Sequence, residues 1–227
     1  MKFISEFIDF MLPRMCFACG EKLSTSEFFI CTPCSNTFKY ADADRIQNEF
    51  HRKFSADKII SDFHSLFVFE KDKGLQELVH SIKYGDSFRL GQYLGRIAGI
   101  KLKDKIGSWT ADLLVPVPLH HVKKADRGYN QSFYIAKGIS SVCRIPVSQS
   151  IVKRNRYTPS QTQLNKSERI ENMLGAFQVK KPQQVKDKSI IIIDDVITTG
   201  STISECGKVF TNAGAKNVYA LSLAIAD

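Results

Sequence analysis

The sequence lacks the long hydrophobic run that a membrane-spanning helix needs. Such a helix takes about 20 apolar residues in succession, whereas the longest apolar runs here, near 113–119 and 190–193, have the length of strands. Proline and glycine are also scarce, at 7 and 13 of 227 residues, and 43% of the residues are hydrophobic. This composition excludes extensive disorder and collagen-like repeats, and it predicts a globular chain with a substantial core.

Acidic residues are in short supply. The chain has 23 Asp and Glu against 32 Lys and Arg, which gives a formal net charge of +9 at pH 7. A positive excess of this size favours polyanionic partners, either nucleic acid or phosphorylated small molecules. Charge alone does not choose between these two classes.

The first twelve residues, MKFISEFIDFML, lack the features of a secretion signal. Glu6 and Asp9 interrupt the apolar stretch, and no cleavage site of small residues follows it. We therefore expect a cytoplasmic protein. The apolar residues of this segment recur at helical spacing before Pro13, which predicts a short amphipathic helix that packs on its own protein or makes at most a peripheral membrane contact.

Four of the six cysteines fall within residues 16–34. Their spacing is Cys-x2-Cys, eleven residues, Cys-x2-Cys, formed by Cys16, Cys19, Cys31 and Cys34. Two such pairs can direct four thiolates at one tetrahedral zinc ion. An iron site or a pair of redox disulfides are the alternatives. A zinc site closed by four thiolates has no position for water, so its expected task is to fold a small N-terminal module.

The rest of the chain alternates between strands and helices. Residues 40–60 are rich in charge and predict a connection or a solvated helix. Predicted strands lie near 64–70, 113–117, 176–179, 190–193 and 218–225, and predicted helices lie near 75–83, 90–98, 133–139 and 203–210. Continuous apolar strands that alternate with helices predict an α/β fold, with a mostly parallel sheet covered by helices on both faces. We place the amphipathic helix, zinc module and connection in residues 1–55, and the α/β domain in residues 56–227.

The segment IIIIDDVITTGST, residues 190–202, is the main candidate for a functional site. Four isoleucines predict a central strand, and Asp194 and Asp195 are expected at its carboxyl end, where ligands bind in open α/β sheets. A turn before the next helix follows, with backbone N–H groups and hydroxyls suited to a phosphate group; its residues are Thr198, Thr199, Gly200, Ser201 and Thr202. Two carboxylates beside a phosphate site suit a phosphorylated ribose.

Other interpretations of this segment are weaker. A dinucleotide-binding loop needs G-x-G-x-x-G and a P-loop needs a lysine after its last glycine, and the turn has one glycine and no lysine. A structural interpretation also exists, in which the turn only caps a helix.

The segment resembles the phosphoribosyl pyrophosphate (PRPP) motif of type I phosphoribosyltransferases. Together with VPVPLH at 115–120, RGYNQ at 127–131, spaced residues between 161 and 177 and the four cysteines, the chain resembles the ComF family of competence proteins. The resemblance implies a zinc-finger module joined to a type I phosphoribosyltransferase-like domain that binds PRPP with Mg²⁺. It also implies a role in natural transformation, in which single-stranded DNA enters the cytoplasm, with a competence helicase or DNA-processing protein as a possible partner.

Two basic residues are further candidates for the PRPP site. Arg127 precedes a helix that is expected to start at Gln131 with Asn130 as its N-cap, and we take Arg127 as a pyrophosphate ligand. Lys83, at the end of a predicted helix, is a candidate phosphate ligand. Both also have simpler interpretations, as a surface arginine and as a lysine at the negative pole of a helix. If the chain is an enzyme, Asp194, Asp195 and Arg127 are the expected catalytic residues, and its nitrogen acceptor stays unnamed; a PRPP-sensing regulator is the alternative.

Residues 151–188 carry nine basic and three acidic side chains, and hence +6 of the net charge. The resemblance places a loop that closes over PRPP in the first half. The charge also suits a DNA backbone, and a solvated basic face is the alternative. The candidate DNA-binding residues are Lys153, Arg154, Arg156, Lys180 and Lys181.

Overall fold

A computed structural model describes residues 13–69, 73–84, 87–156 and 174–226. The predicted amphipathic helix in the first twelve residues lies outside this part of the chain, as do most of the spaced motif residues between 161 and 177. Within the described part, no helix is both long and apolar enough to cross a membrane.

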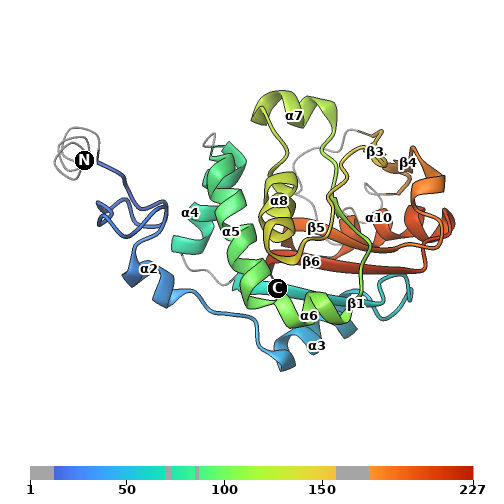
Figure 1. Ribbon diagram of the computed structural model, residues 1–227, viewed down its shortest axis with the longest axis horizontal. Coiled ribbons are helices and arrows are strands. Elements are labelled where there is room, and N and C mark those ends of the chain that lie inside the picture. The colour runs from blue at the N-terminus through green and yellow to red at the C-terminus, as the bar shows by residue number, and fades with distance from the viewer. Residues whose placement is uncertain (1–12, 70–72, 85–86, 157–173, 227) are drawn as a thin grey trace.

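The centre of the molecule is a four-stranded parallel sheet (Figure 1). Its strands are β1 (Asp62–Phe69), β2 (Leu113–Pro116), β5 (Ser189–Ile197) and β6 (Asn217–Ala226), in the order β1-β6-β5-β2. Ile192 of β5 lies opposite Ala220 on one side and Val115 on the other. Two short strands, β3 (Val152–Arg154) and β4 (Phe177–Val179), form a separate antiparallel pair. The predicted parallel sheet is confirmed.

Apolar residues line both faces of the sheet, because the central strands are buried on both sides. One face packs against α4 (Lys73–Tyr84), α5 (Phe88–Lys101), α6 (Lys103–Ser108) and α8 (Gln131–Cys143). The other packs against α3 (Ala43–Lys53) and α10 (Ser201–Asn212). Gly95 of α5 and Gly138 of α8 let these two helices touch, because a Cβ at either would overlap the other helix's backbone. The predicted helices on both faces are thereby confirmed.

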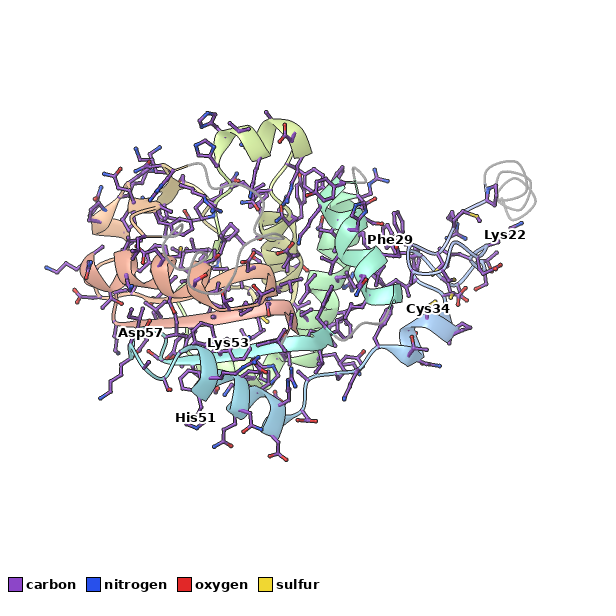
Figure 2. The ribbon with its side chains drawn as sticks, turned by 180° about the vertical axis from the view of Figure 1, so that it is seen from behind. Lys22, Phe29, Cys34, His51, Lys53 and Asp57 are labelled. Atoms are coloured by element: carbon purple, nitrogen blue, oxygen red, sulfur yellow. The ribbon has the colours of Figure 1, made fainter. Side chains whose placement is uncertain are left out.

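The cysteine-containing segment lies at one side of the sheet and helices (Figure 1). It includes α2 (Thr32–Thr37), and Phe29 packs on Tyr93 of α5 with ring centroids 5.2 Å apart (Figure 2). The chain then runs along the free edge of β1, where Val68 donates its N–H to the Lys39 carbonyl at 2.9 Å and Ala41 donates to the Leu66 carbonyl at 3.1 Å. These contacts join the cysteine-containing segment to the sheet.

Two local expectations need correction. Strand β5 continues to Ile197, because Asp194 and Val196 still pair with β6, so the two aspartates lie within the strand and not beyond its end. Arg127 precedes α8 as expected, but it does not lie in a basic loop, because it is the last residue of a further helix, α7 (His121–Arg127). The adjacent expectation is right: Asn130 caps α8 by accepting a hydrogen bond from the Ser132 N–H at 3.0 Å.

Candidate functional site

The turn between β5 and α10 is shaped around a glycine. Gly200 has a φ of +81°, a left-handed conformation that residues with a Cβ rarely adopt. A Cβ at this position would also lie 2.9 Å from the Phe54 ring. Beside the glycine, the hydroxyls of Thr199 and Ser201 lie 2.9 Å apart. The turn is therefore a compact loop that leads into α10. Its hydroxyls and N–H groups lie at the N-terminus of this helix.

The two aspartates differ in their surroundings. Ser132 donates its hydroxyl to Asp194 Oδ1 at 3.1 Å, whereas Asp195 Oδ2 pairs with Lys83 Nζ at 3.1 Å and accepts from Gln131 Nε2 at 3.5 Å. Burial, together with the negative charge of Asp195, raises the pKa of Asp194 to about 7. Burial alone would raise the pKa of Asp195, but Lys83 and the N–H of Val196 outweigh it and hold this pKa below its usual value. Near neutral pH, the pair therefore carries one firmly ionised carboxylate and one that titrates.

A cavity of about 480 Å³ opens in front of these aspartates. Its wall includes four basic side chains from three different regions: Lys83 of α4, Lys123 and Arg127 of α7, and Arg154 of β3. Burial, assisted by the positive charges of the other three, lowers the pKa of Lys123 to about 8. The Arg154 guanidinium lies 5.5 Å from the centre of the Phe177 ring. The cavity thus combines a carboxylate pair with a cationic wall.

Most predicted site residues meet in this cavity. Its lining includes Asp194, Asp195, Thr198, Thr199, Gly200, Thr202, Lys83 and Arg127. Ser201, the first residue of α10, is not among the lining residues. Of the candidate DNA-binding residues, Arg154 lines the cavity, whereas Lys153, Arg156 and Lys180 are exposed and Lys181 is half-buried.

Three lining residues are not among the site residues predicted from the sequence. Lys123 lies four residues before Arg127, so both are on one face of α7, but the sequence pattern does not predict this helix. Gln131 and Ser132 follow the N-cap of α8 and reach the aspartates. The Gln131 side chain is buried, and its Oε1 has no hydrogen-bond partner among the described residues. This oxygen is therefore a buried acceptor beside the cavity.

The four cysteines of the N-terminal segment converge on one point. Their sulfur atoms all lie within 4.8 Å of one another, and the Sγ atoms of Cys19 and Cys31 are 3.8 Å apart. Four sulfurs at about 2.3 Å from a tetrahedral zinc ion would be about 3.8 Å apart. The cluster could therefore hold a metal ion such as zinc.

Backbone groups around the cluster also favour thiolates. The N–H groups of Ala18 and Cys31 point at the Cys16 sulfur, at 3.4 and 3.3 Å. Burial opposes ionisation of Cys16, but the N–H groups of Cys31 and Ala18 outweigh it and lower the pKa of this thiol to about 7. Burial raises the pKa of Cys34, and the neighbouring cysteines add to this. A bound cation would compensate this crowding of sulfur atoms.

Comparisons with known proteins agree with this geometry. Residues 130–225 match the family model described as "Phosphoribosyl transferase domain", a range that runs from the N-cap of α8 through β5, the turn and α10 into β6. The chain is 27% identical over 214 residues to "Competence protein F" of Haemophilus influenzae, covering 92% of this chain and 90% of that protein. The resemblance to the ComF family is confirmed.

Two further relatives carry related names. "Competence protein ComFC" of Streptococcus pneumoniae is 23% identical over 230 residues, covering 92% of this chain and 98% of that protein. "DNA utilization protein YhgH" of Escherichia coli K12 is 29% identical over 147 residues, covering 63% of this chain and 64% of that protein. The chain thus combines a region that matches the phosphoribosyl transferase domain with a four-cysteine cluster.

Proposed function

We propose that this chain is a ComF-like protein that binds PRPP in the cavity and assists the uptake of transforming single-stranded DNA into the cytoplasm. The observation that carries PRPP binding is the pairing of Asp194 and Asp195 with the turn at 198–202, opposite a cationic wall. The names of the relatives favour the role in competence. A competence helicase or DNA-processing protein is the partner expected in that setting.

Each part of PRPP has a chemical counterpart in the cavity. The aspartates can accept hydrogen bonds from the two ribose hydroxyls, and the turn can donate N–H groups to the 5-phosphate. The pyrophosphate, carried with Mg²⁺, would face Lys83, Lys123, Arg127 and Arg154. A volume of about 480 Å³ lies within the range of small-molecule sites. We assign the four-cysteine cluster to structural zinc.

Calorimetry with PRPP and MgCl₂ tests this proposal. Replacing both aspartates, Asp194→Asn with Asp195→Asn, should weaken binding by about 2 to 4 kcal/mol, because two charge-assisted hydrogen bonds to the ribose are lost. Asp187→Asn, on an exposed turn, is the control for removal of a carboxylate. Unchanged PRPP affinity in the double variant would place the ligand elsewhere.

A second measurement separates the alternatives for the reaction. Pyrophosphate release from PRPP, when nitrogen nucleophiles are supplied, identifies an active phosphoribosyltransferase in which Asp194 and Asp195 face the reacting sugar and Arg127 faces the pyrophosphate. Binding without release identifies a PRPP-sensing regulator or adaptor. Both outcomes keep PRPP as the ligand of the cavity.

A surface next to the cavity favours single-stranded DNA as a second ligand. Aromatic rings and basic side chains contact one another across α4, α5, the end of α7 and α8. We call this the aromatic–cation surface, and it is formed by Tyr84, Phe88, Tyr129, Phe133, Tyr134, Arg89, Arg127 and Lys137. Tyr84 is 59% exposed and Phe88 is 38% exposed. Tyr84 and Arg127 also line the cavity, so the surface continues from its rim. Exposed rings beside cations can stack bases while neutralising phosphates.

Fluorescence anisotropy with a mixed-sequence single-stranded oligonucleotide tests DNA binding at two places. Replacing Tyr84 and Phe88 by alanine should weaken binding at every salt concentration, because stacking is lost. Replacing Lys180 and Lys181 by glutamine should lower the salt dependence, because contacts with phosphates are lost, and should spare PRPP binding. Absence of DNA binding at low salt would contradict the DNA part of the proposal.

A further inference from the structure

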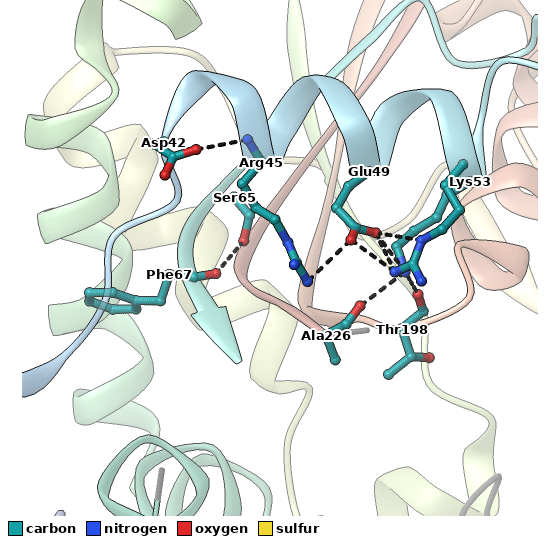
Figure 3. A network of polar contacts seen from close by, with 9 residues as sticks. Asp42, Arg45, Glu49, Lys53, Ser65, Phe67, Thr198 and Ala226 are labelled. Atoms are coloured by element: carbon teal, nitrogen blue, oxygen red, sulfur yellow. Dashed lines mark hydrogen bonds and ion pairs between the residues drawn. The ribbon is translucent and has the colours of Figure 1, made fainter. Parts of the chain in front are cut away.

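The last turn of α3 lies directly behind the turn at 198–202. Lys53 donates hydrogen bonds from its Nζ to the carbonyl oxygens of Thr198 and Ala226, the latter at 2.9 Å (Figure 3). The Lys53 side chain is only 4% exposed. A buried ammonium group therefore connects the start of the turn with the end of β6.

A carboxylate on the preceding turn of α3 holds this ammonium in place. Glu49, whose side chain is 5% exposed, lies 3.1 Å from Lys53 Nζ. Arg45 and Arg52 contact the same carboxylate at 3.2 and 2.6 Å (Figure 3). These partners lie three or four residues from Glu49, so one helix presents all of them on neighbouring positions. Lys53 is consequently fixed by its own helix as well as by the turn.

The same end of α3 also restrains the middle of the turn. A Cβ at Gly200 would lie 3.1 Å from the Lys53 Cβ and 2.9 Å from the Phe54 ring, so the glycine backbone packs against both residues. The turn is thus held at two points, the Thr198 carbonyl by a hydrogen bond and Gly200 by packing. Both holding groups come from residues before the sheet begins.

The bond to the Thr198 carbonyl also has an electronic effect on the turn. This carbonyl belongs to the same peptide group as the N–H of Thr199. A cation that polarises the carbonyl strengthens the N–H as a donor, because hydrogen bonds in a chain reinforce one another. The Thr199 N–H lies in the turn that faces the cavity.

We infer that Lys53 is a positioning residue for anion binding: held by Glu49, it orients and polarises the peptide group between Thr198 and Thr199 so that the turn binds the 5-phosphate of its ligand. The inference rests on the proposed function, which assigns the 5-phosphate to this turn. It extends the site to a helix that lies outside the matched phosphoribosyl transferase domain. Lys53 does not line the cavity, so it acts through the turn.

Calorimetry with two partial ligands, ribose 5-phosphate and inorganic pyrophosphate with Mg²⁺, separates positioning from general destabilisation. Lys53→Met should weaken ribose 5-phosphate binding about tenfold or more, because loss of a charged donor frees the turn. Pyrophosphate binding, which depends on the cationic wall, should stay within about twofold of wild type. Lys53→Arg, which keeps a cation, should restore part of the lost affinity, and Lys216→Met, at an exposed lysine, should change neither.

Hydrogen exchange of the ligand-free protein gives a readout that does not depend on PRPP. The amides of residues 198–202 should exchange faster in Lys53→Met than in wild type, with the amides of β5 unchanged. Equal weakening of both partial ligands, or unaltered exchange in the turn, would overturn the inference. Failure of wild type to bind PRPP or ribose 5-phosphate would instead overturn the proposed function.

Discussion

Around the four cysteines, the buried apolar residues within 13–37 are few: Cys16, Leu23, Ile30 and Cys31. Strand β5, by contrast, has four successive isoleucines with no exposed surface, and helices cover both faces of its sheet. A segment with so small a core cannot rely on packing, so it needs a metal or another cross-link to hold its shape. The sheet can rely on packing alone. The cysteine segment should therefore be sensitive to metal removal, and the sheet should be sensitive to truncation of its buried side chains.

Removal of the metal should have the largest effect. Chelation or Cys31→Ser should unfold the cysteine segment while the sheet stays folded, because structural zinc supplies about 10 to 16 kcal/mol of apparent binding free energy to a small module. Metal analysis should find about one zinc per chain, and limited proteolysis should locate the cleavage. Cys143→Ser, outside the cluster, is the matched control. Iron, or a reduced and folded sample without metal, would contradict the assignment.

Truncation of a buried side chain in the sheet should have the next largest effect. It should destabilise the sheet and leave the metal site intact. Ile192→Ala should lower the free energy of unfolding by about 2 to 5 kcal/mol in urea, because a fully buried side chain is truncated. The metal content should be unchanged. Ile100→Ala, at a side chain that is 56% exposed, should cost less than about 0.5 kcal/mol. Equal costs at the two positions would show that the sheet does not rely on its packing.

Ionisation of the Asp194 carboxyl should lower the free energy of unfolding. The folded-state pKa of Asp194 is raised to about 7, so its carboxyl stabilises the fold at low pH and this contribution is lost as the pH rises through 7. Asp194→Asn should thus raise the free energy of unfolding at pH 8 by on the order of 2 kcal/mol and change it little at pH 4. Urea titrations at the two pH values measure this difference. A gain that is independent of pH would show that ionisation is not its cause.

A methyl group at Gly200 should have the smallest effect. Gly200→Ala should cost about 1 to 2 kcal/mol, because the residue needs a positive φ and its Cβ would meet the Phe54 ring. Gly107→Ala, in α6 with open space around it, should instead stabilise the fold by about 0.5 to 1 kcal/mol. Urea denaturation distinguishes the signs. The same sign for both variants would contradict this account of the turn.

The sequence predicts the fold well where apolar periodicity is strong. The isoleucines of β5, the helical stripe of α10 and the N-cap Asn130 all have local signals that agree with the structure. The extension of β5 past Asp194 has no such signal, because pairing with β6 overrides the polar residues. The helix α7, with the sequence HVKKADR, lacks an apolar stripe and has no buried residue.

The site is predictable where residue types point to their chemistry. The carboxylates, the turn and the cysteines have spacings that by themselves indicate a function. Glu49 and Lys53 do not, because a charged segment normally predicts a solvated helix, and burial of such a pair depends on which distant backbone groups it meets. The role of Lys123 is not predictable for the same reason, because its neighbours in the cavity include residues of α4 and β3.

The contact of residues 39–41 with β1 bears on how the protein avoids aggregation. β1 is an edge strand, and an uncovered edge offers its N–H and C=O groups to the edge of another molecule. The chain that leaves the cysteine cluster covers this edge at Leu66 and Val68. Metal loss that frees this chain would leave a folded domain with an open edge, and light scattering after chelation should then report self-association. The four cysteines would in this way help to prevent association through the edge of β1.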